Sequence, residues 1–171
     1  EMCIRDRRKS LSCKLLEACA DGWTSEVRRL LENDGDVIDV NFLGRDYMTP
    51  LHFAAEEGHV DVVKMLIEYD ADVNAIDKSN GTALHKATYY GHMDVAKMLL
   101  QNGADVNAVD KCKRTALHEV ADNGHVDVAK MLIQNGADVN AVEKDKFTAL
   151  HVAACEGYRS GEGGDTVSYT H

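Results

Sequence analysis

The sequence predicts an all-α solenoid, and three observations carry this prediction. First, the tetrapeptide Thr-x-Leu-His returns at an interval of 33 residues, starting at Thr49, Thr82, Thr115 and Thr148. Second, a glycine stands nine residues after each of these threonines, at Gly58, Gly91, Gly124 and Gly157. Third, apolar residues recur between these landmarks at spacings of three and four, which is typical of helices with one buried face. A fixed period of this length indicates an array of identical supersecondary units.

The first helix of each unit is expected directly after the threonine. In the unit 77–107, the hydroxyl of Thr82 can accept a hydrogen bond from a backbone N–H of the first turn, as an N-cap does. Leu84 and Ala87 lie three residues apart and therefore share one face of a helix of about two turns. Gly91 ends this helix, because glycine adopts backbone conformations that other residues resist.

The second helix of the unit is expected to begin near Met93. Its apolar residues recur at spacings of three and four, at Val95, Ala96, Leu99 and Leu100. Lys97 and Gln101 can face water, so the pattern indicates a half-buried helix. Gly103 stands where a left-handed C-terminal cap belongs. The residues after it lead to the next threonine as an extended, hairpin-like loop. Because one unit cannot bury both helices alone, neighbouring units must stack into an elongated solenoid.

These residues resemble the ankyrin repeat. The similarity rests on the run Thr49-Pro50-Leu51-His52-Phe53-Ala54-Ala55, then Gly58-His59 and Val73-Asn74, and it extends over roughly residues 11–158. Pro50 occupies the first helical position, where its fixed φ suits a helix start. The resemblance implies an all-α ankyrin-repeat solenoid of stacked helix-turn-helix units with β-hairpin-like loops. It also implies that the histidine of each Thr-x-Leu-His motif hydrogen-bonds within and between repeats.

The expected domain organisation follows the period. Residues 1–10 are expected to be a non-native or disordered N-terminal tail, because Met2 to Arg7 resemble adapter sequence and do not continue the repeat. A degenerate capping repeat occupies 11–41, in which Cys19 fills the core. Full repeats follow at 42–74, 75–107 and 108–140, then a truncated repeat at 141–158 and a disordered or non-native tail at 159–171. We therefore expect the chain to be a fragment of a larger protein.

Composition excludes several classes of function. The chain has 171 residues, 44% of them apolar, which is enough for a core. Its formal charge of −10 argues against nucleic-acid binding, which normally leaves a basic footprint. The sequence shows neither a signal peptide nor a run of 18 apolar residues, so no membrane insertion is expected. The five cysteines follow no regular spacing, so reduced thiols and a cytoplasmic or nuclear location are favoured.

No pattern of residues indicates catalysis, a cofactor or a metal site. Seven of the eight histidines fall at repeat positions, one repeat apart, whereas metal ligands must converge on one ion. We therefore expect structural histidines. No Gly-x-Ser-x-Gly motif or separate Cys–His pair occurs, so we expect no enzyme. Cys112 lies between two lysines that could lower the pKa of its thiol, although an ordinary exposed thiol is the simpler interpretation.

Candidate interface residues are those that vary between otherwise near-identical units, because packing fixes the shared positions. In ankyrin repeats such positions lie on the loop tips and on the exposed face of the first helix, which line a concave surface. The candidate protein-binding residues are Arg45, Met48, Phe53, Glu56, Glu57, Lys78, Lys86, Tyr89, Tyr90, Lys111, Arg114, Glu119, Asp122, Asn123, Lys144 and Phe147.

Tyr89 and Tyr90 stand out among them, because tyrosine offers a large contact area and is enriched at interface hot spots. One of the two rings could instead pack against a neighbouring repeat. Lysines make the later loop tips locally basic, which would suit an acidic partner segment or reflect solvated charges alone. The asparagines Asn74, Asn107 and Asn140 each follow a leucine by eight residues, as at hydroxylated asparagines of ankyrin repeats, although bonding to the turn backbone is the simpler role.

The sequence thus favours a monomeric module without cofactor that binds a partner protein through its concave face. The alternative is a targeting or regulatory segment of a larger enzyme, such as a kinase or ubiquitin ligase, or of an ion channel. The residues themselves do not separate these two hypotheses.

Overall fold

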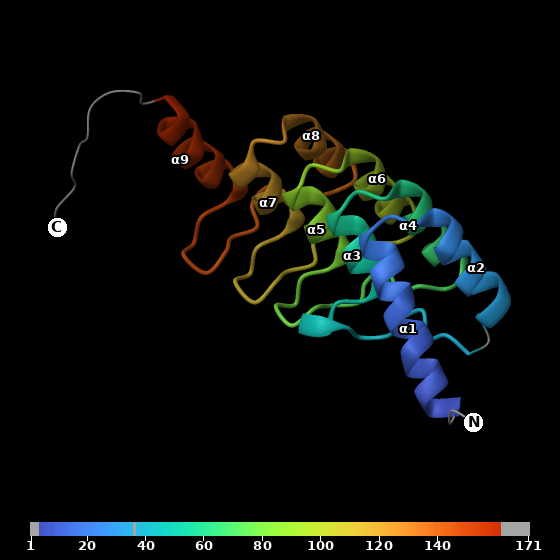
Figure 1. Cartoon of the computed structure of the whole chain (residues 1–171). Coiled ribbons are helices and arrows are strands. Elements are labelled where there is room, and N and C mark those ends of the chain that lie inside the picture. The colour runs from blue at the N-terminus through green and yellow to red at the C-terminus, as the bar shows by residue number, and fades with distance from the viewer. Residues whose placement is uncertain (1–3, 36, 162–171) are drawn as a thin grey trace.

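The computed structural model describes residues 4–35 and 37–161, which contain only helices and loops (Figure 1). The expected all-α solenoid is confirmed for this part of the chain. Its α-helices are α1 (Ile4–Ala20), α2 (Thr24–Asp34), α3 (Pro50–Glu56), α4 (Val60–Glu68), α5 (Ala83–Tyr89), α6 (Met93–Gln101), α7 (Ala116–Asn123), α8 (Val126–Gln134) and α9 (Ala149–Gly161). A short 3₁₀ helix, η1, covers Arg45–Tyr47 in the loop before α3.

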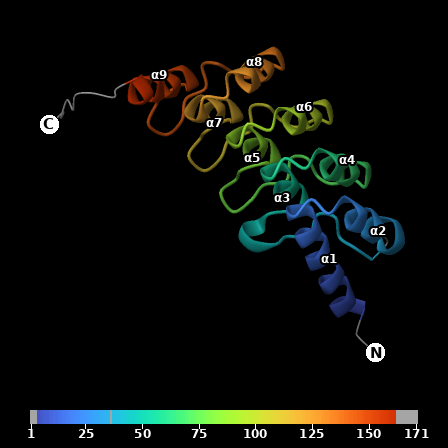
Figure 2. The same cartoon turned by 45° about the horizontal axis from the view of Figure 1, so that its top comes forward.

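The helices form two parallel rows, as Figure 2 shows. The helices α1, α3, α5, α7 and α9 make one row, in which each packs on the next, and α2, α4, α6 and α8 make the other. Neighbours in the first row contact each other more extensively than neighbours in the second row do. The first row is therefore the tighter one, and the stack curves toward the side that carries the first helices and the loops. This side is the concave face.

The core is a strip between the two rows. Leu51 and Leu84 of the first row are 1% exposed, while Leu66, Leu99 and Leu132 of the second row are fully buried. Each such leucine contributes roughly 2 kcal/mol through the apolar surface that it removes from water. In the part of the chain that the structure describes, the extensive helix–helix contacts join helices of the same or adjacent units, so stability depends on nearest neighbours, as expected for a solenoid.

The helix boundaries agree with the expected caps. Thr82 is the N-cap of α5, and α6 begins at Met93. Gly91 and Gly103 have left-handed φ values of 77° and 88°, as their positions after α5 and α6 require. Asp70 adopts the same region after α4, with a φ of 62°.

The loops between the units are closed like hairpins and are tied to each other. The N–H of Asp77 donates to the carbonyl of Gly81 at 2.9 Å, and Asp110 donates to Arg114 in the same way at 3.0 Å. Between neighbouring loops, the N–H of Lys111 donates to the carbonyl of Ser79 at 2.9 Å. The loop tips therefore form a continuous edge beside the first helices, although no β-strand is assigned in the described residues.

The first repeat keeps the register of the others, although its segment from Gly22 to Asn41 is three residues longer than that from Gly58 to Asn74. The side chain of Asn41 accepts a hydrogen bond from the N–H of Asp72 at 2.8 Å, and Asn74 accepts one from Asp105 at the same distance. The side chain of Asn74 also donates to the carbonyl of Gly103 at 3.0 Å. These asparagines therefore link consecutive repeats, which supports their structural role.

Helices α1 and α9 extend into the two segments that the sequence analysis predicts as tails. Residues 4–10 belong to α1, because no glycine or proline interrupts the chain between Ile4 and Ala20. At the other end, α9 continues through Gly157 to Gly161, so this glycine does not end its helix as Gly91 does. Residues 1–3, 36 and 162–171 of the chain lie outside the described residues. None of the helices that the structure describes combines the length and apolar character needed to span a bilayer.

Candidate functional site

The concave face is built on a row of buried threonine–histidine pairs. His85 Nδ1 accepts from the backbone N–H of Thr82 at 3.2 Å and lies 3.0 Å from the Thr82 hydroxyl. Its Nε2 lies 3.2 Å from the carbonyl of Arg114 in the next repeat. Because Nδ1 is the acceptor, Nε2 carries the proton and donates it to that carbonyl. Each pair therefore caps its own helix and ties it to the following loop.

The same geometry recurs at His52 and His118, whose Nε2 atoms lie 3.1 and 3.2 Å from the carbonyls of Gly81 and Phe147. Burial lowers the pKa of His52 and His85 below the ordinary value for histidine. The hydrogen bond from each ring to a carbonyl acts in the opposite direction but is the weaker effect. Both rings are therefore neutral near pH 7 and act as hydrogen-bonding groups of the fold.

A second row of histidines explains the Gly-His pairs. Nε2 of His92 lies 3.0 Å from the carbonyl of Glu56, and Nε2 of His125 lies 3.1 Å from that of Tyr89. Their rings cover the glycines of the preceding repeats, since a Cβ atom at Gly58 would lie 2.6 Å from the His92 ring. The structural role expected for the repeated histidines is confirmed. Within the described residues, no three His, Cys, Asp or Glu side chains converge as metal ligands would.

The centre of the concave face holds a cavity of about 360 Å³ over α5 and α7. It unites residues of three successive repeats. Its walls consist of Glu56, Asp77, Ser79, Gly81, His85, Lys86, Tyr89, Tyr90, Asp110, Arg114 and Glu119. Six of these belong to the candidate binding residues, namely Glu56, Lys86, Tyr89, Tyr90, Arg114 and Glu119.

Tyr89 and Tyr90 form an exposed aromatic pair at the edge of this cavity. Their side chains are 46% and 49% exposed, and their ring centroids lie 4.9 Å apart in an edge-to-face arrangement. The hydroxyl of Tyr90 donates to Glu56 of the preceding repeat at 3.4 Å, and its ring stacks on that of His92. Burial and the charge of Glu56 raise the pKa of Tyr90. Tyr90 therefore contacts the neighbouring repeat and still keeps half of its surface free.

Two ion-pair networks hold the charged walls in place. Nζ of Lys86 lies 3.1 Å from Asp77, a carboxylate that also accepts hydrogen bonds from the N–H groups of Ser79 and Gly81. Burial opposes ionisation of Asp77, but these hydrogen bonds and the lysine outweigh it and lower its pKa. The lysine is thus already paired with a carboxylate of its own repeat.

Arg114 is the centre of the second network. Its guanidinium lies 2.8 Å from Asp122 and 3.4 Å from Glu119. Burial raises the pKa of Glu119, and the charge of Arg114 offsets only part of this rise. Burial would lower the pKa of Arg114, but its carboxylate partners outweigh burial and raise it. Lys86 and Arg114, the two cationic side chains of the cavity wall, are therefore both paired with carboxylates of this chain. Because the wall contains more carboxylates than cationic side chains, the cavity carries a net negative charge.

Other candidate residues are placed apart from this cavity. Met48 is only 7% exposed and offers little surface. Arg45 lies over the ring of Phe53 at 5.7 Å, near the first repeat. The remaining exposed candidates are spread along the loop edge and helix ends, at Glu57, Lys78, Lys111, Asn123, Lys144 and Phe147.

Sequence reasoning missed Asp77 and Asp110, which line the cavity. Each follows the Asp-Val-Asn segment by three residues and accepts hydrogen bonds from the N–H groups two and four residues later. An aspartate at the start of a polar loop is the usual signal for such a turn. Cys112 stands on the next loop as an exposed free thiol, and Cys19 is buried, with its pKa raised to about 12 by burial.

Comparison with known proteins identifies the repeat. A family model described as "Ankyrin repeats (3 copies)" matches residues 15–110, more than half of the chain. A second model, "Ankyrin repeats (many copies)", matches residues 89–133 and 120–161.

Three curated proteins are similar over shorter stretches. The "Probable E3 ubiquitin-protein ligase XBOS33" of Oryza sativa subsp. japonica is 40% identical over 68 residues, which are 37% of this chain and 13% of that protein. "Ankyrin repeat domain-containing protein 49" of Drosophila melanogaster is 40% identical over 68 residues, 40% of this chain and 31% of the relative. "Protein VAPYRIN-LIKE" of Medicago truncatula is 36% identical over 58 residues, 34% and 12% of the two chains. The similarity thus spans less than a third of each relative.

Proposed function

Because the chain belongs to the ankyrin repeat family, whose repeats are protein-interaction modules, we propose that it binds a partner protein through its concave face and performs no catalysis itself. The contact is centred on the cavity beside Tyr89 and Tyr90.

The exposed tyrosine pair is the observation that carries this proposal. At the equivalent positions the neighbouring repeats have Glu56-Glu57 and Asp122-Asn123, so the pair is not required by the repeat. Two large aromatic side chains that remain about half exposed beside a cavity are the kind of anchor found at interface hot spots. Fixing these two side chains on binding costs little conformational entropy, because each ring already contacts the other.

The charges around the pair restrict the partner's chemistry. Lys86 and Arg114 are satisfied by carboxylates of this chain, so they offer little to an acidic ligand inside the cavity. The exposed lysines lie farther out on the loop edge, at Lys111, Lys113, Lys144 and Lys146. A partner segment would therefore place an apolar or aromatic side chain beside the tyrosines and its acidic residues along the loops.

The test separates the concave face from the outer helices. A partner captured by the tagged protein from its native cells would be purified, and its affinity measured for the wild type and for Tyr89→Ala and Tyr90→Ala. We expect a loss of about 1 to 2 kcal/mol or more in binding free energy at the stronger site. Tyr69→Ala is the matched control, since Tyr69 is 39% exposed at the end of α4 in the outer row. Unchanged affinity for both tyrosine variants would contradict the proposal.

A second candidate function is that of a targeting or regulatory segment within a larger enzyme, such as a kinase or ubiquitin ligase, or within an ion channel. The similarity to a protein named as a probable E3 ubiquitin-protein ligase favours it, although only 13% of that protein is matched. Sequencing the complete transcript decides between the two, because a catalytic or membrane domain would be encoded beside the repeats.

We further propose that the array is a monomer located in the cytoplasm or nucleus, with no nucleic-acid partner. Its units would be a degenerate cap at 11–41, repeats at 42–74, 75–107 and 108–140, and a truncated repeat at 141–158. Light scattering after size exclusion should give the mass of one chain. Fluorescence microscopy of a tagged protein checks its location, and a titration with DNA at physiological salt should show no tight binding.

A further inference from the structure

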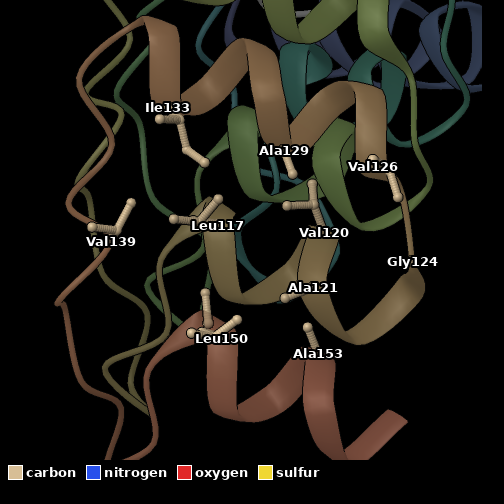
Figure 3. A pocket seen from close by; sticks show the side chains of 11 residues that line it. Leu117, Val120, Ala121, Gly124, Val126, Ala129, Ile133, Val139, Leu150 and Ala153 are labelled. Carbon is tan, nitrogen blue, oxygen red and sulfur yellow. The ribbon is translucent and has the colours of Figure 1, made fainter. Parts of the chain in front are cut away.

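Helix α7 places a carboxylate beside the tyrosine pair of the concave face. Figure 3 shows Leu117 and Val120 of this helix pointing into an apolar hollow, which they share with side chains of α8 and α9. Because both side chains are buried, apolar packing fixes the orientation of α7. Glu119 of the same helix lines the charged cavity instead, together with Tyr89 and Tyr90. The position of the Glu119 carboxylate in that cavity is therefore set by the fold.

Glu119 and Lys86 occupy the same position of consecutive repeats with opposite charge, four residues after the capping threonine. In the earlier repeat, Nζ of Lys86 lies 3.1 Å from Oδ2 of Asp77, whose Oδ1 accepts two loop N–H groups. In the later repeat, Oδ1 of Asp110 accepts the two equivalent N–H groups. Among the residues that the structure describes, no cationic side chain lies within salt-bridge distance of Asp110. Asp110 thus lacks the lysine partner that Asp77 has.

Arg114 compensates only part of this negative charge. Its guanidinium lies 2.8 Å from Asp122 and 3.4 Å from Glu119, so Asp122 is the closer partner. Glu119 is 9% exposed, and within the described part of the chain its carboxylate forms no other salt bridge or hydrogen bond. Burial and the negative charges of Asp110 and Asp122 raise the pKa of Glu119, against the effect of Arg114. Three carboxylates therefore lie near one guanidinium, and a further cation would be bound favourably there.

We infer that the cavity binds an arginine side chain of the partner protein, with its guanidinium beside Asp110 and Glu119. Its aliphatic stem would lie along the rings of Tyr89 and Tyr90. A guanidinium forms paired hydrogen bonds with carboxylates, stacks on aromatic rings and is more weakly hydrated than an ammonium group, so it suits a site that combines both features. The stem is the apolar group that we expect beside the tyrosines. The inference rests on the proposed binding through the concave face and specifies the side chain that enters it.

The probe for this site is the peptide acetyl-Gly-Arg-Gly-amide, titrated into the complete isotope-labelled chain. Binding is followed by the backbone amide chemical shifts in NMR spectra, and we expect saturable changes at Glu119 and Tyr89. A peptide with citrulline in place of arginine has nearly the same shape without the charge, and it should bind about tenfold more weakly or worse. A lysine peptide should also bind more weakly, because an ammonium group does not form the paired, planar hydrogen bonds of a guanidinium.

Variants of one position test where the charge is recognised. Glu119→Gln keeps the size of the side chain and removes its charge, so it should weaken binding of the arginine peptide about tenfold. Glu119→Lys repeats the residue of the preceding repeat and should abolish binding, because an ammonium group of the chain itself then pairs with Asp110. Glu68→Gln is the matched control, since it makes the same change of charge on α4 of the outer row, at a side chain that is 57% exposed. Melting curves verify that each variant folds.

The outcomes separate this inference from the proposed function. It is overturned if the arginine peptide does not bind, if the citrulline or lysine peptide binds equally well, or if Glu119→Gln binds the arginine peptide as the wild type does. These results leave the proposed function standing, because that function is tested by the affinity of the purified partner. A partner whose affinity is unchanged by Tyr89→Ala and by Tyr90→Ala contradicts the proposed function, and the inference with it, even if the peptide binds.

Discussion

The central repeat and the last unit carry the same four-residue motif in different surroundings. Thr82-Ala83-Leu84-His85 and Thr148-Ala149-Leu150-His151 both form the local cap, with the threonine N–H 3.2 Å from the histidine Nδ1 in each. Yet Leu84 is 1% exposed and Leu150 is 77% exposed. The motif therefore determines the start of the helix, whereas burial, and the stability that comes with it, depends on the neighbouring repeat.

The leucines test this comparison with the largest expected effect. Leu84→Ala should lower the free energy of unfolding by about 2–5 kcal/mol, because it leaves a cavity between fully packed repeats. Leu150→Ala should change it by less than about 0.5 kcal/mol, as exposed substitutions generally do. Urea unfolding followed by circular dichroism measures both. Equal losses would mean that the last unit is packed as tightly as the central one.

The glycines after the first helices give the next largest effect. Gly91 and Gly124 both have left-handed φ values, 77° and 72°, so alanine at either position costs about 1 kcal/mol in strain. A Cβ atom at Gly91 would also lie 2.7 Å from the His125 ring, whereas at Gly124 it meets nothing within 4 Å. Gly91→Ala should therefore lose about 1–3 kcal/mol more than Gly124→Ala in the same unfolding assay. Similar losses would argue that His125 moves aside without cost.

The buried histidines of the interior predict a dependence on pH. Burial lowers the pKa of His52 and His85 in the folded chain, so the unfolded chain takes up protons first as the pH falls below about 6.5. The contribution of these two histidines to the free energy of unfolding is complete above that pH. It declines below that pH, by at most about 1.4 kcal/mol per pH unit for each histidine.

The measurement is the urea midpoint between pH 8 and pH 5. The double variant His52→Gln/His85→Gln should show a shallower decline, because glutamine can serve in the same capping position without titrating. An unchanged slope would mean that other groups cause the acid sensitivity.

Much of the fold follows from the sequence because it depends on local rules. The period, the N-cap at Thr82, the start of α6 at Met93 and the left-handed glycines are all set by residues close in the chain. The start of α1 at Ile4 is less predictable, because the repeat pattern does not extend to these residues and only the absence of glycine and proline favours a helix there.

The candidate site was less predictable, because it depends on how one repeat is placed on the next. The carbonyl partner of His85 belongs to Arg114, 29 residues away. Met48 occupies a position that varies between repeats, and yet its side chain is buried. The guanidinium of Arg114 donates to Asp122, eight residues later, and is therefore already paired. Differences between the repeats indicate the positions that packing does not fix. Only the stacked structure shows which of these residues are exposed next to one another.

The smallest expected effect concerns a difference between the interior repeats themselves. Asp70 occupies the left-handed position that Gly103 and Gly136 hold after α6 and α8, with φ values of 62°, 88° and 88°. A Cβ atom at either glycine would meet nothing within 4 Å, so the cost of a side chain here is backbone strain alone. Asp70→Gly should therefore raise the free energy of unfolding by a few tenths to about 1 kcal/mol, partly offset by the greater freedom of glycine in the unfolded chain. A small rise in the melting temperature is the expected readout. A clear destabilisation would show that the Asp70 side chain stabilises the end of α4 and outweighs the strain.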